Sequence, residues 1–207
     1  MKIAINGFGR IGRTFFRAAY ENKLDIVAVN DLSDIKTLVH LLKYDSAYGH
    51  FEGKLEIGEG EILVDNKPIM VLSQKEPEKI PWSKLGVDLV VESTGVFCDY
   101  KGAYGHIKAG AKNVIISAPV KNSPTGEKKI RTFILGINEE KLNLKEDKVI
   151  SMASCTTNCL VPVADVLNKN FNIKKSSMST IHAYTMDQRL QDDAHKDLRR
   201  ARAAGLS

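Results

Sequence analysis

Cysteine is scarce in this chain of 207 residues, which contains only Cys98, Cys155 and Cys159. Three cysteines do not form the disulfide framework of a small secreted domain, so we expect a reduced, cytoplasmic protein. Long apolar runs are also missing, and no segment reaches the roughly 18 apolar residues that a membrane-spanning helix needs. The N-terminus lacks the apolar core and cleavage site of a signal peptide and instead resembles a first strand.

A large excess of one charge is missing too, because 30 basic and 25 acidic residues leave a net charge of +5. The basic residues are spread along the chain, apart from clusters at 121–131 and 196–202. We interpret the first cluster as solvated loop and expect an anion site in part of the second. A nucleic-acid partner is not expected. Salt-sensitive DNA or RNA binding that depends on Arg199, Arg200 and Arg202 would indicate the opposite.

Internal repeats and low-complexity linkers are absent, and the first half alternates short β-branched runs with helical stretches. This pattern predicts an α/β fold with a Rossmann-like, mostly parallel sheet. Short runs between residues 53 and 73 predict inserted antiparallel hairpins. The pattern changes at Ser151, which predicts a first domain over 1–151 and the start of an α+β domain over 152–207. The expected strands are 2–6, 26–30, 55–57, 61–64, 68–72, 88–92, 113–117, 132–135 and 176–183.

The expected helices have apolar residues at helical spacing. They cover residues 10–21, 35–43 and 100–109, and a further helix follows Cys155. The residues expected to face the core are Ile11, Phe15, Ala18 and Ala19 in the first helix, Leu38, Leu41 and Leu42 in the second, and Leu160, Val163, Ala164, Leu167 and Phe171 in the last.

A G-x-G-x-x-G run lies between the first strand and the first helix. Gly7 permits a tight turn, Gly9 lets the backbone approach a pyrophosphate, and Gly12 lets the helix pack on the strand. Asp31 ends the second strand 19 residues after Gly12, where a carboxylate binds the ribose hydroxyls of a dinucleotide. Because a carboxylate there repels a 2′-phosphate, we expect NAD and not NADP.

Cys155 lies at the expected start of a helix, where the helix dipole favours the reactive thiolate. Backbone amides at the same place suit an oxyanion, although a small buried cysteine is an equal alternative from position alone. His182 ends an expected strand among polar residues, which suits a general base. We expect Cys159 and Cys98 to be buried. A metal site from Cys155, Cys159 and His182 lacks zinc-ligand spacing and a fourth ligand.

Taken together, these segments resemble the phosphorylating glyceraldehyde-3-phosphate dehydrogenases, in their bacterial and plastid form. The segments that carry the resemblance are Asn6–Arg13, Val29–Asp31, Tyr44–Ser46, Val91–Phe97, Ala153–Leu160, His182–Thr185 and Asp197–Ala204. The resemblance implies NAD as cofactor and a homotetramer. The residues that it implies for NAD binding are Gly7, Gly9, Arg10, Ile11, Gly12, Asp31, Lys75, Thr94, Gly95 and Ser117.

The resemblance also implies the reaction. Cys155 attacks the aldehyde of glyceraldehyde 3-phosphate while His182 takes the thiol proton. The hemithioacetal is oxidised by NAD to a thioester, which inorganic phosphate cleaves to 1,3-bisphosphoglycerate. Ser154, Thr156, Thr185 and Arg200 would bind the phosphate groups. This scheme is chemically coherent, because a thiolate provides a tetrahedral centre and then conserves the oxidation energy in an activated acyl group.

Departures from the family pattern leave other interpretations open. Met186 and Asp193 replace usual family residues near the cofactor, and Asp193 again favours NAD. Family members continue well beyond Ser207, so we expect an incomplete chain with little activity and a tendency to aggregate. Erythrose-4-phosphate dehydrogenase and a nucleotide-binding module without catalysis stay as alternatives.

Overall fold

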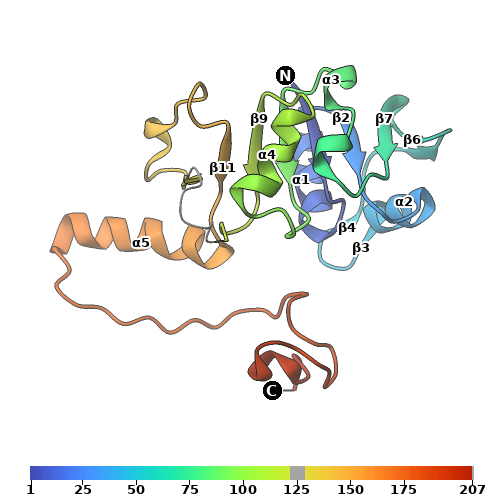
Figure 1. The fold of residues 1–207 in the computed structure, drawn as a ribbon. Coiled ribbons are helices and arrows are strands. Elements are labelled where there is room, and N and C mark those ends of the chain that lie inside the picture. Colours follow the sequence, from blue (N-terminus) through green and yellow to red (C-terminus); the bar gives the residue numbers. More distant parts are fainter. Residues whose placement is uncertain (122–128, 207) are drawn as a thin grey trace. The chain divides into compact units, whose positions relative to one another are not determined.

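The computed structural model describes residues 1–121 and 129–206 (Figure 1). The chain divides into two compact units, Met1–Val166 and Leu167–Ser207. Residues 122–128, within the basic cluster at 121–131, lie outside the described residues. Within the described ranges, no helix combines the length and the apolar character needed to cross a lipid bilayer.

The first unit is built on a sheet whose nine described strands lie in the order β10-β11-β9-β8-β1-β2-β7-β6-β5. The strands are β1 (Lys2–Asn6), β2 (Asp25–Asn30), β5 (Leu55–Ile57), β6 (Glu61–Val64), β7 (Lys67–Leu72), β8 (Leu89–Glu92), β9 (Asn113–Ile116), β10 (Arg131–Thr132) and β11 (Val149–Ser151). All neighbours pair in parallel except the β5-β6-β7 meander. The mostly parallel α/β fold is therefore confirmed, including its inserted hairpins.

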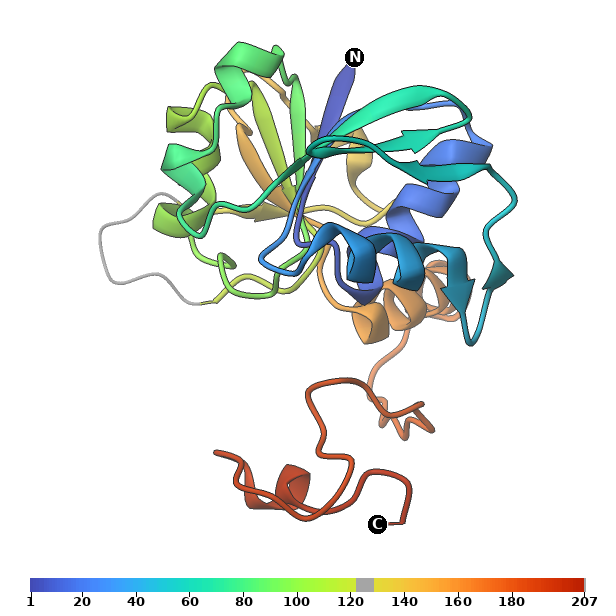
Figure 2. The ribbon, with the colours of Figure 1, turned by 90° about the vertical axis from the view of Figure 1, so that its right-hand side faces the viewer.

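Helices cover both faces of this sheet. Helices α1 (Arg10–Glu21) and α2 (Ile35–Lys43) contribute Phe16 and Leu38 to one core, whereas α3 (Trp82–Leu85) and α4 (Tyr100–Lys108) contribute Trp82 and Ala103 to the other. Figure 2 shows the green helices α3 and α4 on one side of the strands and the blue helix α1 on the other. Alternate strand residues point to opposite faces, so Ile3 and Ala4 enter different cores.

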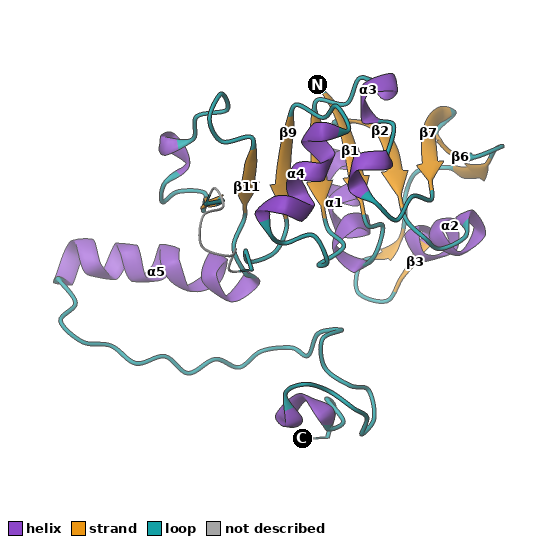
Figure 3. Cartoon of the chain, in the orientation of Figure 1, coloured by secondary structure: helices purple, strands orange, loops and turns teal. Residues whose placement is uncertain are grey.

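Short elements complete the chain. Strands β3 (Tyr44–Asp45) and β4 (Gly49–His50) form a small antiparallel ribbon after α2. Single 3₁₀ turns are η1 (Pro77–Lys79), η2 (Glu139–Lys141) and η3 (Leu198–Ala201) (Figure 3).

Two of the expected core faces are wrong in detail. In α1 the buried residues are Gly12, Phe16 and Ala19, whereas Ile11 is exposed. In α2 the buried residues include Val39, and Leu41 is exposed. The reason is geometric: the sequence shows which residues are apolar, but the direction from which the sheet approaches the helix selects the buried stripe.

Helix α5 (Cys155–Phe171) forms as expected, yet none of its residues is buried, and Cys159 is exposed. The expectations of a buried α5 face and a buried Cys159 are therefore wrong, because no described element covers this helix. Cys98 is buried, as expected. The described stretch 176–183 contains no strand, since it lacks a partner strand that would accept its backbone hydrogen bonds.

The second unit is stabilised by charged pairs and by backbone contacts. Arg189 donates to the Ala194 carbonyl at 2.7 Å and forms an isolated bridge with Ala203. Arg200 pairs with Asp187 at 2.6 Å. The described residues of this unit are exposed or half-buried, so the unit has no hydrophobic core of its own.

Candidate active site

The carboxyl ends of five neighbouring parallel strands meet at one edge of the sheet. Strands β1, β2, β8, β9 and β11 end at Asn6, Asn30, Glu92, Ile116 and Ser151. The glycine run, Asp31, Thr94, Ser117 and Cys155 follow these five ends directly. The sheet topology therefore gathers residues from five distant parts of the sequence at one edge, where α/β proteins bind their ligands.

The glycine loop has the geometry that its sequence predicts. Gly7 has a φ of +89°, and an added Cβ would lie 2.7 Å from the Thr94 nitrogen. A Cβ on Gly12 would lie 2.1 Å from the Gly7 oxygen, so helix and loop are in direct contact. A Cβ on Gly9 would meet nothing within 4 Å. Gly9 is also the N-cap of α1 and has no capping side chain, so the helix start is open to an anion.

Asp31 lies next to this loop and is partly exposed. Its Oδ2 accepts the Phe8 N–H at 2.8 Å, and its Oδ1 accepts the Ser33 N–H at 2.9 Å. A carboxylate oxygen has room for a further donor, so the ribose role stays compatible with these contacts. Lys75 is exposed after β7, the neighbour of β2.

Arg10 turns its side chain toward the loop after β3. Its guanidinium pairs with the buried carboxylate of Asp45 and lies 5.4 Å from the ring centre of Tyr48. Burial by itself raises the pKa of Asp45, but hydrogen bonds from the Tyr48 and Ala47 N–H groups and from Arg10 prevail and lower it to about 2. The Arg10 side chain is therefore occupied by the 45–48 turn, and only its backbone is directed to the glycine loop's anion site. Ile11 is exposed beside it.

The loop after β8 packs against the glycine loop. The Ser93 hydroxyl donates to the Gly7 carbonyl at 2.7 Å, and Thr94 and Gly95 are exposed next to it. Gly95 has a φ of +72°, which suits glycine. Ser117 is half-buried after β9 and donates its N–H to the Glu92 carbonyl at 3.0 Å.

Cys155 is the first residue of α5 and is exposed. A tight turn leads to it: Ala153 has a φ of +60°, and the Ser151 hydroxyl links the Ala118 carbonyl to the Ala153 N–H. Ser154 caps the helix by accepting the Thr157 N–H at 3.0 Å. Asn158 donates to the Met152 carbonyl at 2.6 Å and so braces the turn from inside the helix.

Ser154 and Thr156, the two expected phosphate ligands beside Cys155, differ in their contacts. The Ser154 hydroxyl is shared between the Thr157 N–H and the Thr157 hydroxyl, whereas Thr156 is half-buried in the first turn. Ser151 and Asn158 received no role from the sequence, although they flank the cysteine. Their polar side chains beside an apolar strand and helix are the signal that could have identified them.

His182, Thr185 and Arg200 belong to the second unit, whereas Cys155 belongs to the first. His182 is exposed, with its Nδ1 2.6 Å from the Ala183 carbonyl. The Thr185 N–H donates to Gln188 Oε1, and Arg200 pairs with Asp187. The pairing of Cys155 with His182, and the phosphate roles of Thr185 and Arg200, stay predictions.

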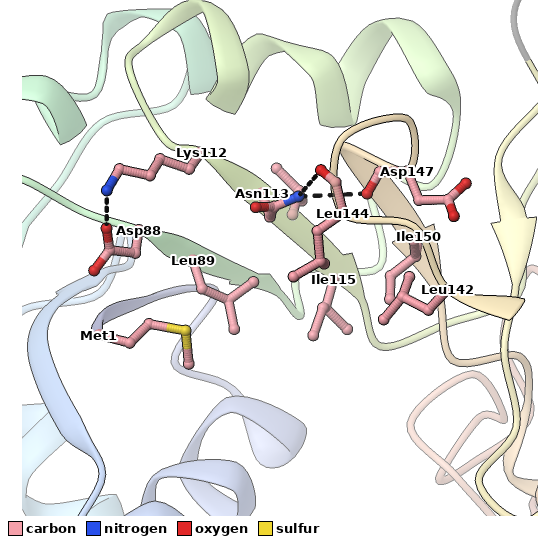
Figure 4. Close-up of a pocket in the computed structure, with 11 residues that line it drawn as sticks. Met1, Asp88, Leu89, Lys112, Asn113, Ile115, Leu142, Leu144, Asp147 and Ile150 are labelled. Carbon is pink, nitrogen blue, oxygen red and sulfur yellow. Dashed lines mark hydrogen bonds and ion pairs between the residues drawn. The ribbon is translucent and has the colours of Figure 1, made fainter. Parts of the chain in front are cut away.

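A hollow in the first unit lies apart from the residues expected in this site. It has a volume of about 420 Å³ and lies over β8, β9 and β11, with mostly apolar walls (Figure 4). Lys112 and Asp88 form an ion pair at 2.6 Å on its rim. None of the expected site residues lines it. Among the described residues no cluster of three or more His, Cys, Asp or Glu side chains is placed to hold a metal ion.

The direction of the chain through the sheet also matters. From β1 the chain proceeds to β2 on one side and later to β8 on the other, so the glycine loop lies at the point where the strand order reverses. This place, together with an open helix start and a following carboxylate, defines a dinucleotide-binding protein of the Rossmann type.

The family models narrow this class. Residues 1–100 match the model of the glyceraldehyde 3-phosphate dehydrogenase NAD binding domain, and residues 154–207 match the C-terminal domain of the same enzymes. The chain belongs to the glyceraldehyde-3-phosphate dehydrogenase family, and NAD is the cofactor of its dinucleotide-binding domain.

Curated relatives match this chain over its whole length. A glyceraldehyde-3-phosphate dehydrogenase of Mycoplasma pneumoniae is 54% identical over 208 residues, and one of Borreliella burgdorferi is 52% identical over 212 residues. The chloroplastic glyceraldehyde-3-phosphate dehydrogenase B of Pisum sativum is 51% identical. Each match covers 100% of this chain but only 60%, 61% and 46% of the relative, respectively. The chain thus spans about three-fifths of the length of the two bacterial relatives.

Proposed function

We propose that this chain carries the NAD site and the nucleophile of a phosphorylating glyceraldehyde-3-phosphate dehydrogenase. One observation supports this most: Cys155 begins α5 directly after β11, at the same sheet edge as the glycine loop after β1. A thiol and a dinucleotide site that share one edge suit a reaction between a covalently held substrate and a nicotinamide. The domain division at 151, the cytoplasmic location and the homotetramer belong to the same proposal.

The chain's own residues perform the following steps. Cys155, as thiolate, attacks the aldehyde carbon of glyceraldehyde 3-phosphate, and His182 accepts the thiol proton. The amides at the start of α5 stabilise the oxyanion that forms on the carbonyl oxygen. A bound NAD would supply the hydride acceptor, and loss of hydride from the hemithioacetal carbon leaves a thioester on Cys155. Inorganic phosphate attacks this thioester and releases 1,3-bisphosphoglycerate and the free thiolate.

The site residues follow from this scheme. Gly7, Gly9, Arg10, Ile11 and Gly12 bind the pyrophosphate through the backbone, and Asp31 binds the ribose hydroxyls. Lys75 lies near the adenine, Ser117 lines the nicotinamide side, and Thr94 and Gly95 belong to the cofactor site. Ser154, Thr156, Thr185 and Arg200 bind the phosphate groups of the substrates.

Thiol reactivity in this chain tests the nucleophile. Cys155 and Cys159 are both exposed on α5, one helical turn apart, so they form a matched pair. We expect iodoacetamide to alkylate Cys155 at least about tenfold faster, because only Cys155 lies at the positive end of the helix dipole. Mass spectrometry of the wild type, Cys155→Ser and Cys159→Ser measures this. Equal rates, with intact NAD binding, would favour a binding module without catalysis.

Turnover tests the enzyme. In an active enzyme that contains this sequence, we expect Cys155→Ser to abolish dehydrogenase activity while NAD still binds. His182→Asn should slow acylation and raise the apparent pKa of the thiol. The 207-residue chain itself should be nearly inactive, because the unit with His182 has no buried core to hold the base in place. Rates with erythrose 4-phosphate and glyceraldehyde 3-phosphate identify the preferred aldehyde.

A further inference from the structure

A buried polar network lies beneath the glycine loop and has no role in the proposed chemistry. Its members are Asn6, Asn30, Glu92, Trp82 and His106, and all five side chains are buried. They come from the ends of β1, β2 and β8 and from helices α3 and α4. Glu92 is 1% exposed and pairs with no lysine or arginine of the described residues, and a carboxylate in such a place is costly unless it is fully hydrogen-bonded.

The direction of the hydrogen bonds is determined from both ends of the network. Trp82 Nε1 has only a donor, so His106 Nδ1, at 2.9 Å, accepts. His106 therefore carries its proton on Nε2 and donates it to Glu92 Oε2 at 3.0 Å. The imidazole is thus neutral in this arrangement.

A second chain of donors begins at the backbone. The Gln74 N–H donates to Asn30 Oδ1 at 2.8 Å, which leaves Asn30 Nδ2 to donate to Asn6 Oδ1 at 2.7 Å. Asn6 Nδ2 then donates to Glu92 Oε2 at 2.6 Å. Both chains of hydrogen bonds run toward the same carboxylate oxygen.

The other oxygen of Glu92 holds the loop above it. Oε1 accepts the Thr94 N–H at 2.8 Å and also the Thr94 hydroxyl. Four donors therefore surround Glu92, two on each oxygen. A glutamine in its place would turn an NH₂ group toward two of these donors in either orientation, so only a carboxylate satisfies the whole network.

Thr94 connects this carboxylate to the cofactor site. A Cβ on Gly7 would lie 2.7 Å from the Thr94 nitrogen and 2.8 Å from its Cγ2, so the two loops are in direct contact. We propose that Glu92 is a positioning residue for the dinucleotide: through Thr94, it holds the Ser93–Gly95 loop against Gly7 and thereby sets the position of the glycine loop that receives the pyrophosphate. This inference rests on the proposed NAD binding.

Thr94→Val tests the proposal, because valine keeps the branched shape and removes the hydroxyl that Glu92 accepts. The variant loses one of the four donors to Glu92 and the acceptor of the Val96 N–H at 3.0 Å, but it keeps the Thr94 N–H, so it should fold with a modestly lower melting temperature. Calorimetry of the 207-residue chain gives the Kd for NAD and for adenosine, which lacks the pyrophosphate. We expect the Kd for NAD to rise about tenfold and that for adenosine to change less than about twofold.

Three further variants separate positioning from general stability. Thr94→Ser retains the hydroxyl that Glu92 accepts and should restore most of the NAD affinity that Thr94→Val loses. Glu92→Gln should weaken NAD binding at least as much as Thr94→Val. Tyr20→Phe is the matched control, because it removes another hydroxyl that donates to a carboxylate, Asp65 at 2.6 Å, and should leave both Kd values unchanged.

The outcomes are distinct. Unchanged NAD affinity in Thr94→Val, or an equal loss for NAD and adenosine, overturns the positioning role while the proposed function stands. A wild-type chain that does not bind NAD overturns the proposed function, and this inference with it. Should Glu92→Gln fail to fold, the comparison of Thr94→Val with Thr94→Ser still decides the matter.

Discussion

The Asp31 carboxylate has a structural role in the glycine loop and a proposed role in cofactor binding. Its two oxygens accept the Phe8 and Ser33 N–H groups, which tie it to the glycine loop and to its own turn. In the proposed cofactor site, the negative charge of Asp31 would face the ribose and repel a 2′-phosphate. We therefore expect Asp31→Asn to lower the ratio of the Kd for NADP to that for NAD by about tenfold. Calorimetric titration with both dinucleotides measures this ratio.

Asp34 provides the control for this experiment. It lies three residues further on and caps α2 through the Thr37 N–H. Asparagine is an equally good N-cap. Asp34→Asn thus removes the same charge with little effect on folding, and its cofactor preference should stay that of the wild type. An equal shift in both variants would mean that net charge, and not the position of Asp31, determines the preference.

Asp45 predicts a pH dependence of stability. Its pKa in the folded state is about 2, below the value of 3.8 for an unperturbed carboxyl group. A depressed folded-state pKa contributes stability that is complete above about pH 4 and is lost as the pH falls toward 2. Urea unfolding of the wild type and of Asp45→Asn should differ most at pH 5 and progressively less at pH 4 and pH 3. A difference that stays constant with pH would contradict this.

At the scale of elements, two glycines at the start of α1 have different roles: Gly12 is needed for folding and Gly9 for cofactor binding. Ala at position 12 would place its Cβ 2.1 Å from the Gly7 oxygen, so we expect Gly12→Ala to destabilise the protein by about 1–3 kcal/mol. Ala at position 9 meets no protein atom within 4 Å, and Gly9 has a φ of −73° that alanine adopts. Gly9→Ala should keep wild-type stability and lose NAD affinity, because its methyl group occupies the space for the pyrophosphate.

Urea unfolding and NAD titration of Gly12→Ala and Gly9→Ala check these two roles. A stable Gly12→Ala protein would show that helix and loop are able to separate at no cost. Full NAD binding by Gly9→Ala would place the pyrophosphate elsewhere.

Other elements show which structural features the local sequence is sufficient to predict. The bounds of β1, α1 and α2 agree with expectation, because each is delimited by a turn signal such as the glycine run or the Asp34 cap. The expected strand at 176–183 failed because a strand exists only through its neighbours. The buried stripes of α1 and α2 failed for a related reason, since their apolar faces are broader than the surface that the sheet covers.

At the scale of the whole molecule, α5 exposes apolar surface. Leu160, Val163, Val166, Leu167 and Phe171 are all exposed, with Phe171 at 76%. An apolar stripe of this length promotes association in water. We expect light scattering to show self-association of the 207-residue chain, and expect Val163→Lys with Val166→Lys to reduce it. NAD binding should survive this change.

Asn168→Lys with Asn170→Lys is the control, because it adds the same two charges to the same helix and removes no apolar side chain. It should associate like the wild type. A wild-type chain that stays monomeric at high concentration would show that the α5 stripe does not drive association.

The amino-acid sequence alone determined the parallel sheet, the glycine loop, Asp31 and the helix that begins at Cys155. These features depend on residue periodicity, turn chemistry and short motifs, which are local properties of the chain. Only the tertiary structure decided that Glu92 receives four donors, that Arg10 turns to Asp45, and that Cys159 is exposed. These outcomes depend on which distant segments meet: Glu92 and Asn6 are 86 residues apart in sequence yet share a hydrogen bond, because β1 and β8 are neighbours in the sheet.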